Sequence, residues 1–157
     1  MLQSYALAFF ISMVPLIELR GGVPVAIYHG IPYIPAVIVC GIANMLPVPF
    51  IYLFARKILL WGSTKRHIGP LFSKILTKGE KAGRKMAATA SRKGLFIALL
   101  LFVGIPLPGT GAWTGTLAAS LLNMGWKSTT GAVSLGVVLA GIIMATVSSL
   151  GLHIFGL

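Results

Sequence analysis

The chain has 157 residues, of which 57% are hydrophobic and only 10% are charged. Soluble domains average about 25% charged residues, so this composition excludes an ordinary water-soluble domain and indicates an integral membrane protein. The net charge of +11 does not indicate nucleic-acid binding, because eleven of the 13 Lys and Arg residues lie in one block from Arg56 to Lys93. A basic block between two apolar halves is typical of a cytoplasmic segment of a membrane protein.

The first apolar region is too short to cross a bilayer. A helix rises 1.5 Å per residue, so Leu2 to Val14 reaches only about 20 Å into a hydrocarbon core of roughly 30 Å. A break rich in Pro and Gly follows from Pro15 to Pro24, and a short second arm runs from Pro24 to His29. We therefore predict a re-entrant hairpin over residues 1–32.

The next apolar region is long enough to span the membrane. Ile34 to Phe54 predicts a transmembrane helix within residues 33–57. Asn44 precedes two prolines in this helix, so we expect its amide to face the protein interior. There it either bonds a freed backbone carbonyl or contacts a substrate. The basic segment that follows, residues 58–93, lies either along the inner leaflet or in water as a loop with helical stretches.

The second half repeats this order. Leu95 to Ile105 is another short apolar arm, Pro106 to Gly111 breaks it, and Trp113 to Met124 forms a return arm. We predict a second re-entrant hairpin over residues 94–126. A second transmembrane helix is predicted within residues 127–157, where Gly131 to Phe155 is apolar.

A row of small residues runs along this last helix. Ala132, Gly136 and Ala140 are spaced four apart and form one face. Such a face allows close helix packing, either within the chain or across a dimer.

The layout predicts an all-α membrane fold of two inverted halves, each made of a re-entrant helical hairpin and a transmembrane helix. Positive charge places residues 58–93 in the cytoplasm, so the first hairpin enters from outside, the second from the cytoplasm, and both termini lie outside. Paired, interrupted apolar segments in two halves indicate a binding site near the bilayer midplane. Four ordinary spans with kinks are the alternative. The predicted location is the cytoplasmic (inner) membrane, with several passes.

The first tip contains the charges. Glu18 is the only carboxylate in an apolar segment, and Arg20 lies two positions further on. Ionisable residues inside a membrane are costly and usually functional. They either pair with each other and stabilise the tip, or serve a ligand.

The second tip carries no charge. Free backbone N–H groups at Gly109, Thr110 and Gly111, just before a half-helix near Trp113, favour an anion, although a tight turn explains the small residues equally well. Both tips contribute to the candidate substrate or ion site, whose residues are Glu18, Arg20, Gly21, Gly22, Pro24, Asn44, Pro106, Pro108, Gly109, Thr110, Gly111, Trp113 and Thr114.

The sequence offers no material for an enzyme. His29, His67 and His153 do not cluster, so no metal site is indicated, and there is no Ser/His/Asp or Cys/His set. We therefore expect no catalytic residues, no metal and no cofactor.

Two motifs resemble those of the small multidrug export protein family. They are Glu-Leu-Arg-Gly-Gly-Val-Pro at residues 18–24 and Pro-Leu-Pro-Gly-Thr-Gly-Ala-Trp-Thr-Gly at residues 106–115. That family is distantly similar to the DedA or VTT superfamily, some of whose members move lipids across membranes. The resemblance implies a role for Glu18 as the hairpin carboxylate. It departs in the second hairpin, where DedA proteins carry arginine and Leu95 to Trp126 has no charge.

These observations predict a small transporter with its substrate site between the two tips. A non-transporting scaffold or assembly factor and a channel are the alternatives. Glu18 is the one carboxylate available for coupling to protons, and Arg20 with the second tip favours an anionic or phospholipid-like ligand over a cationic amphiphile. The expected partners are therefore membrane lipids, a small amphiphilic or anionic substrate, protons, and further copies of the chain in a homo-oligomer.

Overall fold

A computed structural model describes residues 2–74, 76–77 and 91–155. Throughout these residues the chain forms helices and no strand, which confirms the all-α class. The helices are α1 (Leu2–Met13), α2 (Glu18–Tyr28), α3 (Tyr33–Met45), α4 (Pro47–Ser63), α6 (Arg92–Gly104), α7 (Ala112–Leu121) and α8 (Trp126–Phe155).

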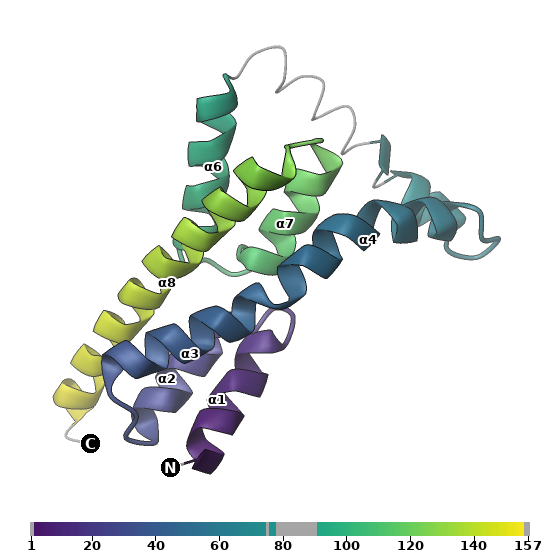
Figure 1. The fold of residues 1–157 in the computed structure, drawn as a ribbon. Helices are drawn as coiled ribbons and strands as arrows, with labels where there is room; N and C mark the ends of the chain where they lie inside the picture. The colour runs from purple at the N-terminus through teal and green to yellow at the C-terminus, as the bar shows by residue number, and fades with distance from the viewer. Residues whose placement is uncertain (1, 75, 78–90, 156–157) are drawn as a thin grey trace.

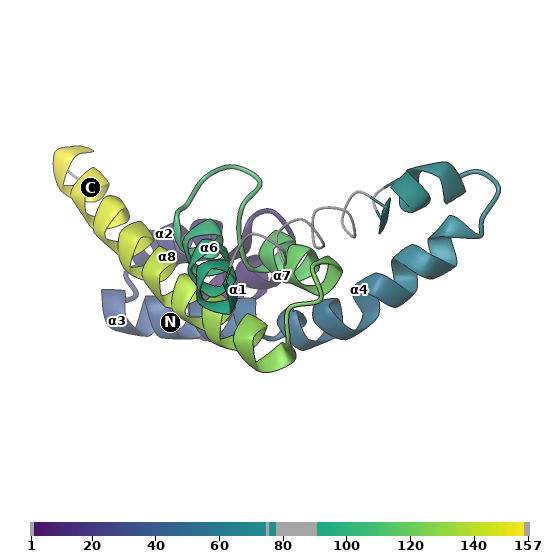
Figure 2. The same ribbon diagram turned by 90° about the horizontal axis from the view of Figure 1, so that it is seen from above.

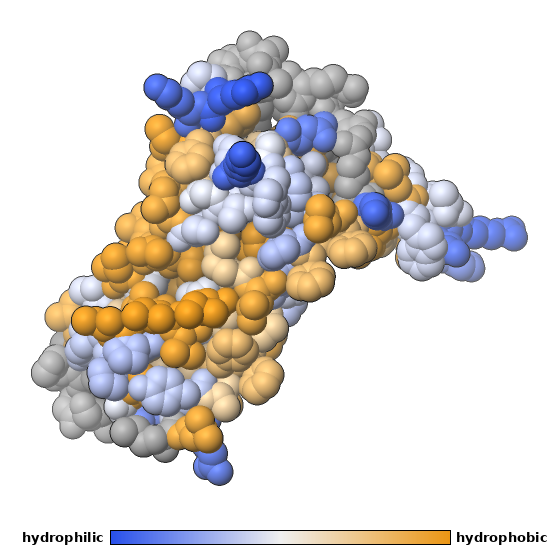
Figure 3. All heavy atoms as spheres, in the orientation of Figure 1, coloured by the Kyte–Doolittle hydropathy of each residue, from blue (hydrophilic) through white to orange (hydrophobic). Residues whose placement is uncertain are grey.

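Two helices are long and apolar enough to cross a membrane. One runs through α3 and α4 from Tyr33 to Ala55, and the other covers most of α8, from Trp126 to Gly151. They overlap the two spans expected from the sequence, although α4 continues to Ser63, beyond the expected end at residue 57. Large apolar side chains cover the outside of the molecule, as the orange surface in Figure 3 shows. Such a surface is stable in lipid and not in water.

The first hairpin turns more tightly than the sequence predicted. α1 ends at Met13 and α2 already begins at Glu18, so only residues 14–17 form the turn. The expected break through Pro24, and the expected return arm from Pro24 to His29, are wrong: Arg20, Gly21, Gly22 and Pro24 all lie inside α2.

Close packing explains why glycine continues this helix instead of ending it. A Cβ atom at Gly22 would lie 1.8 Å from Ser12 Oγ on α1, so only glycine lets the two arms approach this closely. Pro24 is tolerated because helices inside a membrane protein accept a missing donor when neighbours surround them.

The second hairpin has a longer turn. α6 begins at the cap residue Ser91, whose hydroxyl accepts the Gly94 N–H at 3.1 Å. Residues 105–111 form a non-helical loop, and α7 then returns along α6. Its arms also meet at a glycine, since a Cβ atom at Gly115 would lie 2.6 Å from Val103 Cγ2.

The two hairpins approach the middle of the molecule from opposite ends (Figure 1). The first hairpin begins with α1 and returns with α2 at the end of the molecule where the N and C labels lie. The second hairpin begins with α6 and returns with α7 at the opposite end. α2 lies at the centre, with Leu19 and Val23 buried, and contacts α1, α3 and α8. α8 packs along α6, and α7 packs on α4, which leads away from the other helices in Figure 2.

The small residues of α8 are used inside the chain. Ala132, Gly136 and Ala140 are buried on one face of the helix. A Cβ atom at Gly136 would lie 2.7 Å from Val103 Cβ and 2.8 Å from the Leu100 carbonyl oxygen, both on α6. Of the two roles expected for this row, the structure shows packing within the chain.

Candidate functional site

The carboxylate of Glu18 caps a helix of the other hairpin. Its two oxygens accept the backbone N–H groups of Ala112 and Trp113, each at 3.0 Å. These are the first residues of α7, whose own N-cap residue, Gly111, has no side chain to offer. The first N–H groups of a helix have no partner within the helix, and the helix dipole attracts negative charge there. Glu18 therefore supplies hydrogen-bond acceptors to the first N–H groups of α7, although Ala112 lies 94 positions further along the chain.

The guanidinium of Arg20 binds the end of α6 and the loop behind it. It donates to the Thr110 carbonyl at 2.6 Å and to Thr110 Oγ1 at 2.7 Å, and also to the Leu107 carbonyl. Longer bonds reach the carbonyls of Ile105 at 3.2 Å and Val103 at 3.4 Å. The last carbonyls of a helix lack intrahelical partners, so a forked cation suits this position.

Thr110 holds the loop in the shape that Arg20 recognises. Its hydroxyl lies 3.0 Å from the Ile105 carbonyl oxygen and 2.9 Å from that of Leu107, so its single proton is shared between these two acceptors while its oxygen accepts from Arg20. We call Glu18, Arg20 and the backbone of residues 103–113 the tip clamp. It joins the two hairpins where their turns meet.

The tip clamp resolves the question that the sequence left open for the two charges. Glu18 and Arg20 do not bond to each other within the part of the chain that the structure describes; each bonds to the second tip instead. The N–H groups expected to attract an anion do bind one, but that anion is the Glu18 carboxylate. The features that favoured an anionic substrate are thus engaged inside the protein.

Gly111 is required by the tip clamp for two reasons. Its φ of +143° is disfavoured for residues with a side chain. A Cβ atom there would lie 2.2 Å from Glu18 Oε2, so the carboxylate can reach α7 only past a glycine. Glu18 itself has a φ of +54°, a left-handed conformation that costs about 1–2 kcal/mol in a residue with a side chain.

The other predicted site residues lie around the clamp in different roles. Gly21, Gly22 and Pro24 belong to α2, and the loop residues Pro108 and Gly109 are exposed while Pro106 is half-buried. Asn44 is fully buried at the end of α3, and neither of its amide atoms has a hydrogen-bond partner in the described residues. Of the two roles left open for Asn44, the bond to a freed carbonyl is absent among the described residues.

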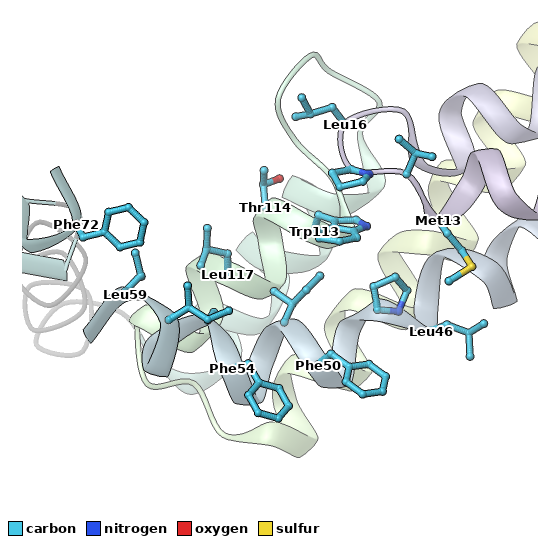
Figure 4. Close-up of a pocket in the computed structure, with 16 residues that line it drawn as sticks. Met13, Leu16, Leu46, Phe50, Phe54, Leu59, Phe72, Trp113, Thr114 and Leu117 are labelled. Carbon is cyan, nitrogen blue, oxygen red and sulfur yellow. The ribbon is translucent and has the colours of Figure 1, made fainter. Parts of the chain in front are cut away.

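A large apolar groove lies beside the clamp (Figure 4). Its volume is about 1110 Å³, and it runs between the first tip, α4 and one face of α7. Phe50 and Phe54 on α4, Trp113 and Leu117 on α7, and Met13 at the end of α1 all line it; in Figure 4 the two phenylalanine rings lie on the side of α4 away from α7. No residue that lines it is charged.

Sequence reasoning found only the part of this groove that lies on α7. Trp113 and Thr114 were candidate residues, and both line it. Phe50 and Phe54 were missed, because aromatic residues in a spanning helix look the same whether they face lipid or a groove. Trp113 connects the two parts of the site: its backbone N–H binds Glu18, and its side chain lines the groove.

The described residues contain no group of three or more His, Cys, Asp or Glu side chains that could hold a metal ion. The site consists instead of one carboxylate and one guanidinium bonded to backbone, next to an apolar surface. An apolar surface of this kind can bind apolar molecules.

Comparison with known proteins finds one family. A family model described as "Putative small multi-drug export protein" matches residues 18–143, which run from the start of α2 through the second tip into α8 and leave out α1 and the turn at residues 14–17. No curated protein and no solved structure matches the chain.

Proposed function

The chain belongs to the small multi-drug export family, and from that premise we propose that it exports small, largely apolar molecules that enter the groove between α4 and α7 from the lipid. Export families move small molecules and are not a class of enzymes. The observation that carries the proposal is the groove itself, with about 1110 Å³ of space and no charged residue in its lining. Pockets of 300–1,000 Å³ with mostly apolar walls suit drug-sized ligands, so this groove has room for one.

The proposed architecture is an inverted repeat with two membrane re-entrant hairpins, seated in the cytoplasmic membrane. Supporting it are hairpins that turn back near the middle of the molecule and come from opposite ends (Figure 1). The exposed cations Lys57, Lys65 and Lys74 lie in the last two turns of α4 or beyond its end, which agrees with a cytoplasmic position for that end.

We propose that opening and closing of the tip clamp changes which side of the membrane the groove faces. The clamp is made of hydrogen bonds between two hairpins and not of covalent or apolar contacts, so it can be broken and remade as a unit. Trp113 takes part in both clamp and groove, so a molecule in the groove acts directly on the residue that Glu18 holds.

The same geometry supports a proposal of proton coupling. Glu18 uses both carboxylate oxygens as acceptors for N–H groups of α7. A proton on Glu18 would place a donor against these donors, which weakens the hold on α7. Protonation of Glu18 is therefore the event that we propose opens the clamp.

The substrate that fits is uncharged or amphiphilic, and not the phospholipid-like anion favoured by the sequence. Arg20 and the N–H groups of α7 already have partners, and the groove offers an ion no counter-charge. Moving an ion into such a surface without a partner is strongly unfavourable.

We also propose that the protein works as a homo-oligomer. Leu107, Pro108 and Gly109 are exposed non-helical backbone at the tip of the second hairpin. Non-helical backbone at membrane depth is stable only where protein or water covers it. A second copy would supply that cover.

The test is export of an uncharged dye, Nile red, by purified protein in liposomes under a proton gradient. Phe50 and Phe10 are both 66% exposed, but only Phe50 lines the groove. We expect Phe50→Ala to slow export about tenfold, as loss of an aromatic contact worth about 1.4 kcal/mol would do. Phe10→Ala removes the same side chain from a surface outside the groove, so the rate should not change.

Each alternative function has its own signature in this assay. Rates that never saturate with dye concentration would indicate a channel. Export no faster than in liposomes without protein would refute transport and leave the scaffold as the remaining function. Equal slowing by both variants would remove the groove as the transport site.

A further inference from the structure

Exposed apolar side chains continue along α4 beyond the part of the helix that can span the membrane. The apolar span ends at Ala55, but α4 runs on to Ser63, and a further helical stretch begins at residue 69. We call residues 57–74 the arm, which leads away from the other helices in Figure 2. Trp61 and Leu71 on the arm are each 60% exposed. Large exposed apolar side chains that gather in one segment mark a contact with a partner or a membrane.

The arm has a defined shape. Leu59 and Phe72 pack together with Leu121 of α7. A Cβ atom at Gly62 would lie 2.1 Å from Phe72 Cδ1, so the second helical stretch of the arm folds back closely onto α4. One side of the arm is therefore covered by the protein itself, and the exposed apolar side chains lie outside this contact.

Positive charge is interspersed with these apolar side chains. Lys57, Lys65, Arg66 and Lys74 are all exposed, and the sequence has no acidic residue from position 57 to position 74. A helical surface that combines tryptophan and leucine with lysine and arginine is typical of segments that lie at the surface of an anionic membrane. The surface that covers the arm must therefore be both apolar and negatively charged.

Two of the cations lie against aromatic rings. Lys57 Nζ lies 5.7 Å from the centre of the Phe54 ring. Lys65 Nζ lies 4.6 Å from the centre of a ring of Trp61. A ring face attracts an ammonium group but leaves its charge and its N–H donors available to a phosphate. Phe54, Lys57 and Trp61 recur every three or four residues and so share one face of α4, where acyl chains and a phosphate can be bound side by side.

We propose that the arm lies in the headgroup layer of the leaflet at the end of α4, the cytoplasmic one in the proposed architecture, and binds anionic phospholipid there. The phosphates contact Lys57 and Lys65. The acyl chains lie against Phe54 and Trp61. Of the two positions left open for the basic segment, this assigns residues 57–74 to the inner leaflet. The lipid is a partner that anchors the arm and not the exported molecule, so the inference does not depend on transport through the groove.

The test uses brominated lipids, which quench tryptophan fluorescence on contact. The protein is reconstituted in phosphatidylcholine bilayers with a fixed fraction of brominated lipid, either anionic phosphatidylglycerol or zwitterionic phosphatidylcholine. The chain has three tryptophans. Each measurement is therefore repeated with Trp61→Phe, and the difference between the two proteins gives the quenching at Trp61.

We expect phosphatidylglycerol to occupy the positions beside Trp61 about fivefold more often than phosphatidylcholine at equal bulk fraction, as one lysine near the membrane surface would produce. The double variant Lys57→Gln, Lys65→Gln should lose most of this preference. Its quenching by phosphatidylcholine should not change, because the apolar side chains of the arm remain. High salt should also weaken the preference in the wild-type protein.

Lys127→Gln is the matched control, because it removes an exposed cation from the start of α8, outside the arm, and should keep the preference. Trp61 that neither lipid quenches would place the arm in water and overturn the proposal. Equal quenching by both lipids would leave the arm in the bilayer but overturn the anionic partner. A preference that survives in the double variant would overturn Lys57 and Lys65 as the contacts. None of these results changes the export assay, so the two proposals can fail separately.

Discussion

The two hairpin tips meet at one place but contribute opposite kinds of groups. The first tip is a short turn that brings two charged side chains, Glu18 and Arg20, at the start of a helix. The second is a seven-residue loop, 105–111, which brings backbone N–H and carbonyl groups and no charge. Halves that share one layout have thus become complementary: one tip holds the side chains and the other holds the helix ends that they cap.

The comparison teaches why the second tip needs no charge of its own. A loop between two helix ends exposes unsatisfied donors on one side and unsatisfied acceptors on the other. One carboxylate and one guanidinium, two positions apart in α2, match both sides at once. In a membrane, where water cannot satisfy these groups, the match is worth more than it would be at a protein surface.

The largest effect is expected where the backbone of the second tip lies closest to the first. Gly111→Ala places a Cβ atom 2.2 Å from Glu18 Oε2 at a residue with φ +143°, so it should destabilise the protein by about 3 kcal/mol or more. Thermal unfolding in mild detergent measures the change.

Gly109→Ala is the control for backbone conformation alone. Gly109 also has a positive φ, +79°, but nothing lies within 4 Å of the added Cβ atom. It should therefore cost only about 1 kcal/mol. Equal losses for the two variants would show that contact with Glu18 is not what constrains the second tip.

The two charges should differ in importance. Arg20 bonds to five acceptor atoms and Glu18 to two donors. Arg20→Gln should lower the free energy of unfolding by about 3 kcal/mol and Glu18→Gln by about 2 kcal/mol, because each leaves backbone groups of the second tip without a partner, and lipid cannot bond them. Chemical unfolding of the purified variants gives both values.

Arg20→Lys tests whether geometry or charge alone matters. An ammonium keeps the charge but lacks the planar fork, so it should restore only part of the loss. Full restoration would mean that the second tip responds to positive charge and not to directed hydrogen bonds. A larger loss for Glu18→Gln than for Arg20→Gln would reverse the proposed ranking.

Effects about as large as that of Glu18→Gln are expected within each hairpin, where a glycine of the return arm meets the entering arm. Gly22→Ala should cost about 2 kcal/mol through contact with Ser12, and Gly115→Ala about as much through contact with Val103. Shortening the opposing residue, Ser12→Ala in the first case and Val103→Ala in the second, should recover part of each loss. A lack of recovery in a double variant would show that the arms do not meet through these residues. Thermal unfolding of single and double variants measures both cycles.

Much of the helical layout could be predicted from the sequence, because it depends on local properties. The end of α1 near Met13, the break after Ile105 and the two long apolar helices follow from hydropathy and proline. The first tip was misjudged because Gly21, Gly22 and Pro24 are common signals of a break. Here Gly22 instead serves close packing against Ser12, which is a tertiary contact that no local pattern reveals.

The residues of the candidate site could be predicted from the sequence, but the hydrogen bonds between them could not. Glu18 and Arg20 were candidates as charges in a membrane segment, and Thr110, Gly111 and Trp113 as the break before a half-helix. The hydrogen bonds of Glu18 and Arg20 join positions more than 80 residues apart. Because most of the partners are backbone groups, the side chains at the second tip give little information about which bonds form. The groove exists because α4 diverges from the other helices, and sequence alone does not determine this arrangement.

The length of chain between the two halves of the tip clamp has a consequence for biosynthesis. Arg20 and Glu18 leave the ribosome long before residues 103–113, to which they bond, have been made. During that interval the N-terminal hairpin holds two charges in or near the bilayer with their final partners still missing. The two charges of the first hairpin therefore lack their hydrogen-bond partners until the second hairpin has been made. In a chain truncated before Val103, insertion of the first hairpin into a membrane would be unfavourable. Synthesis of the second tip is the step that supplies both charges with their hydrogen-bond partners.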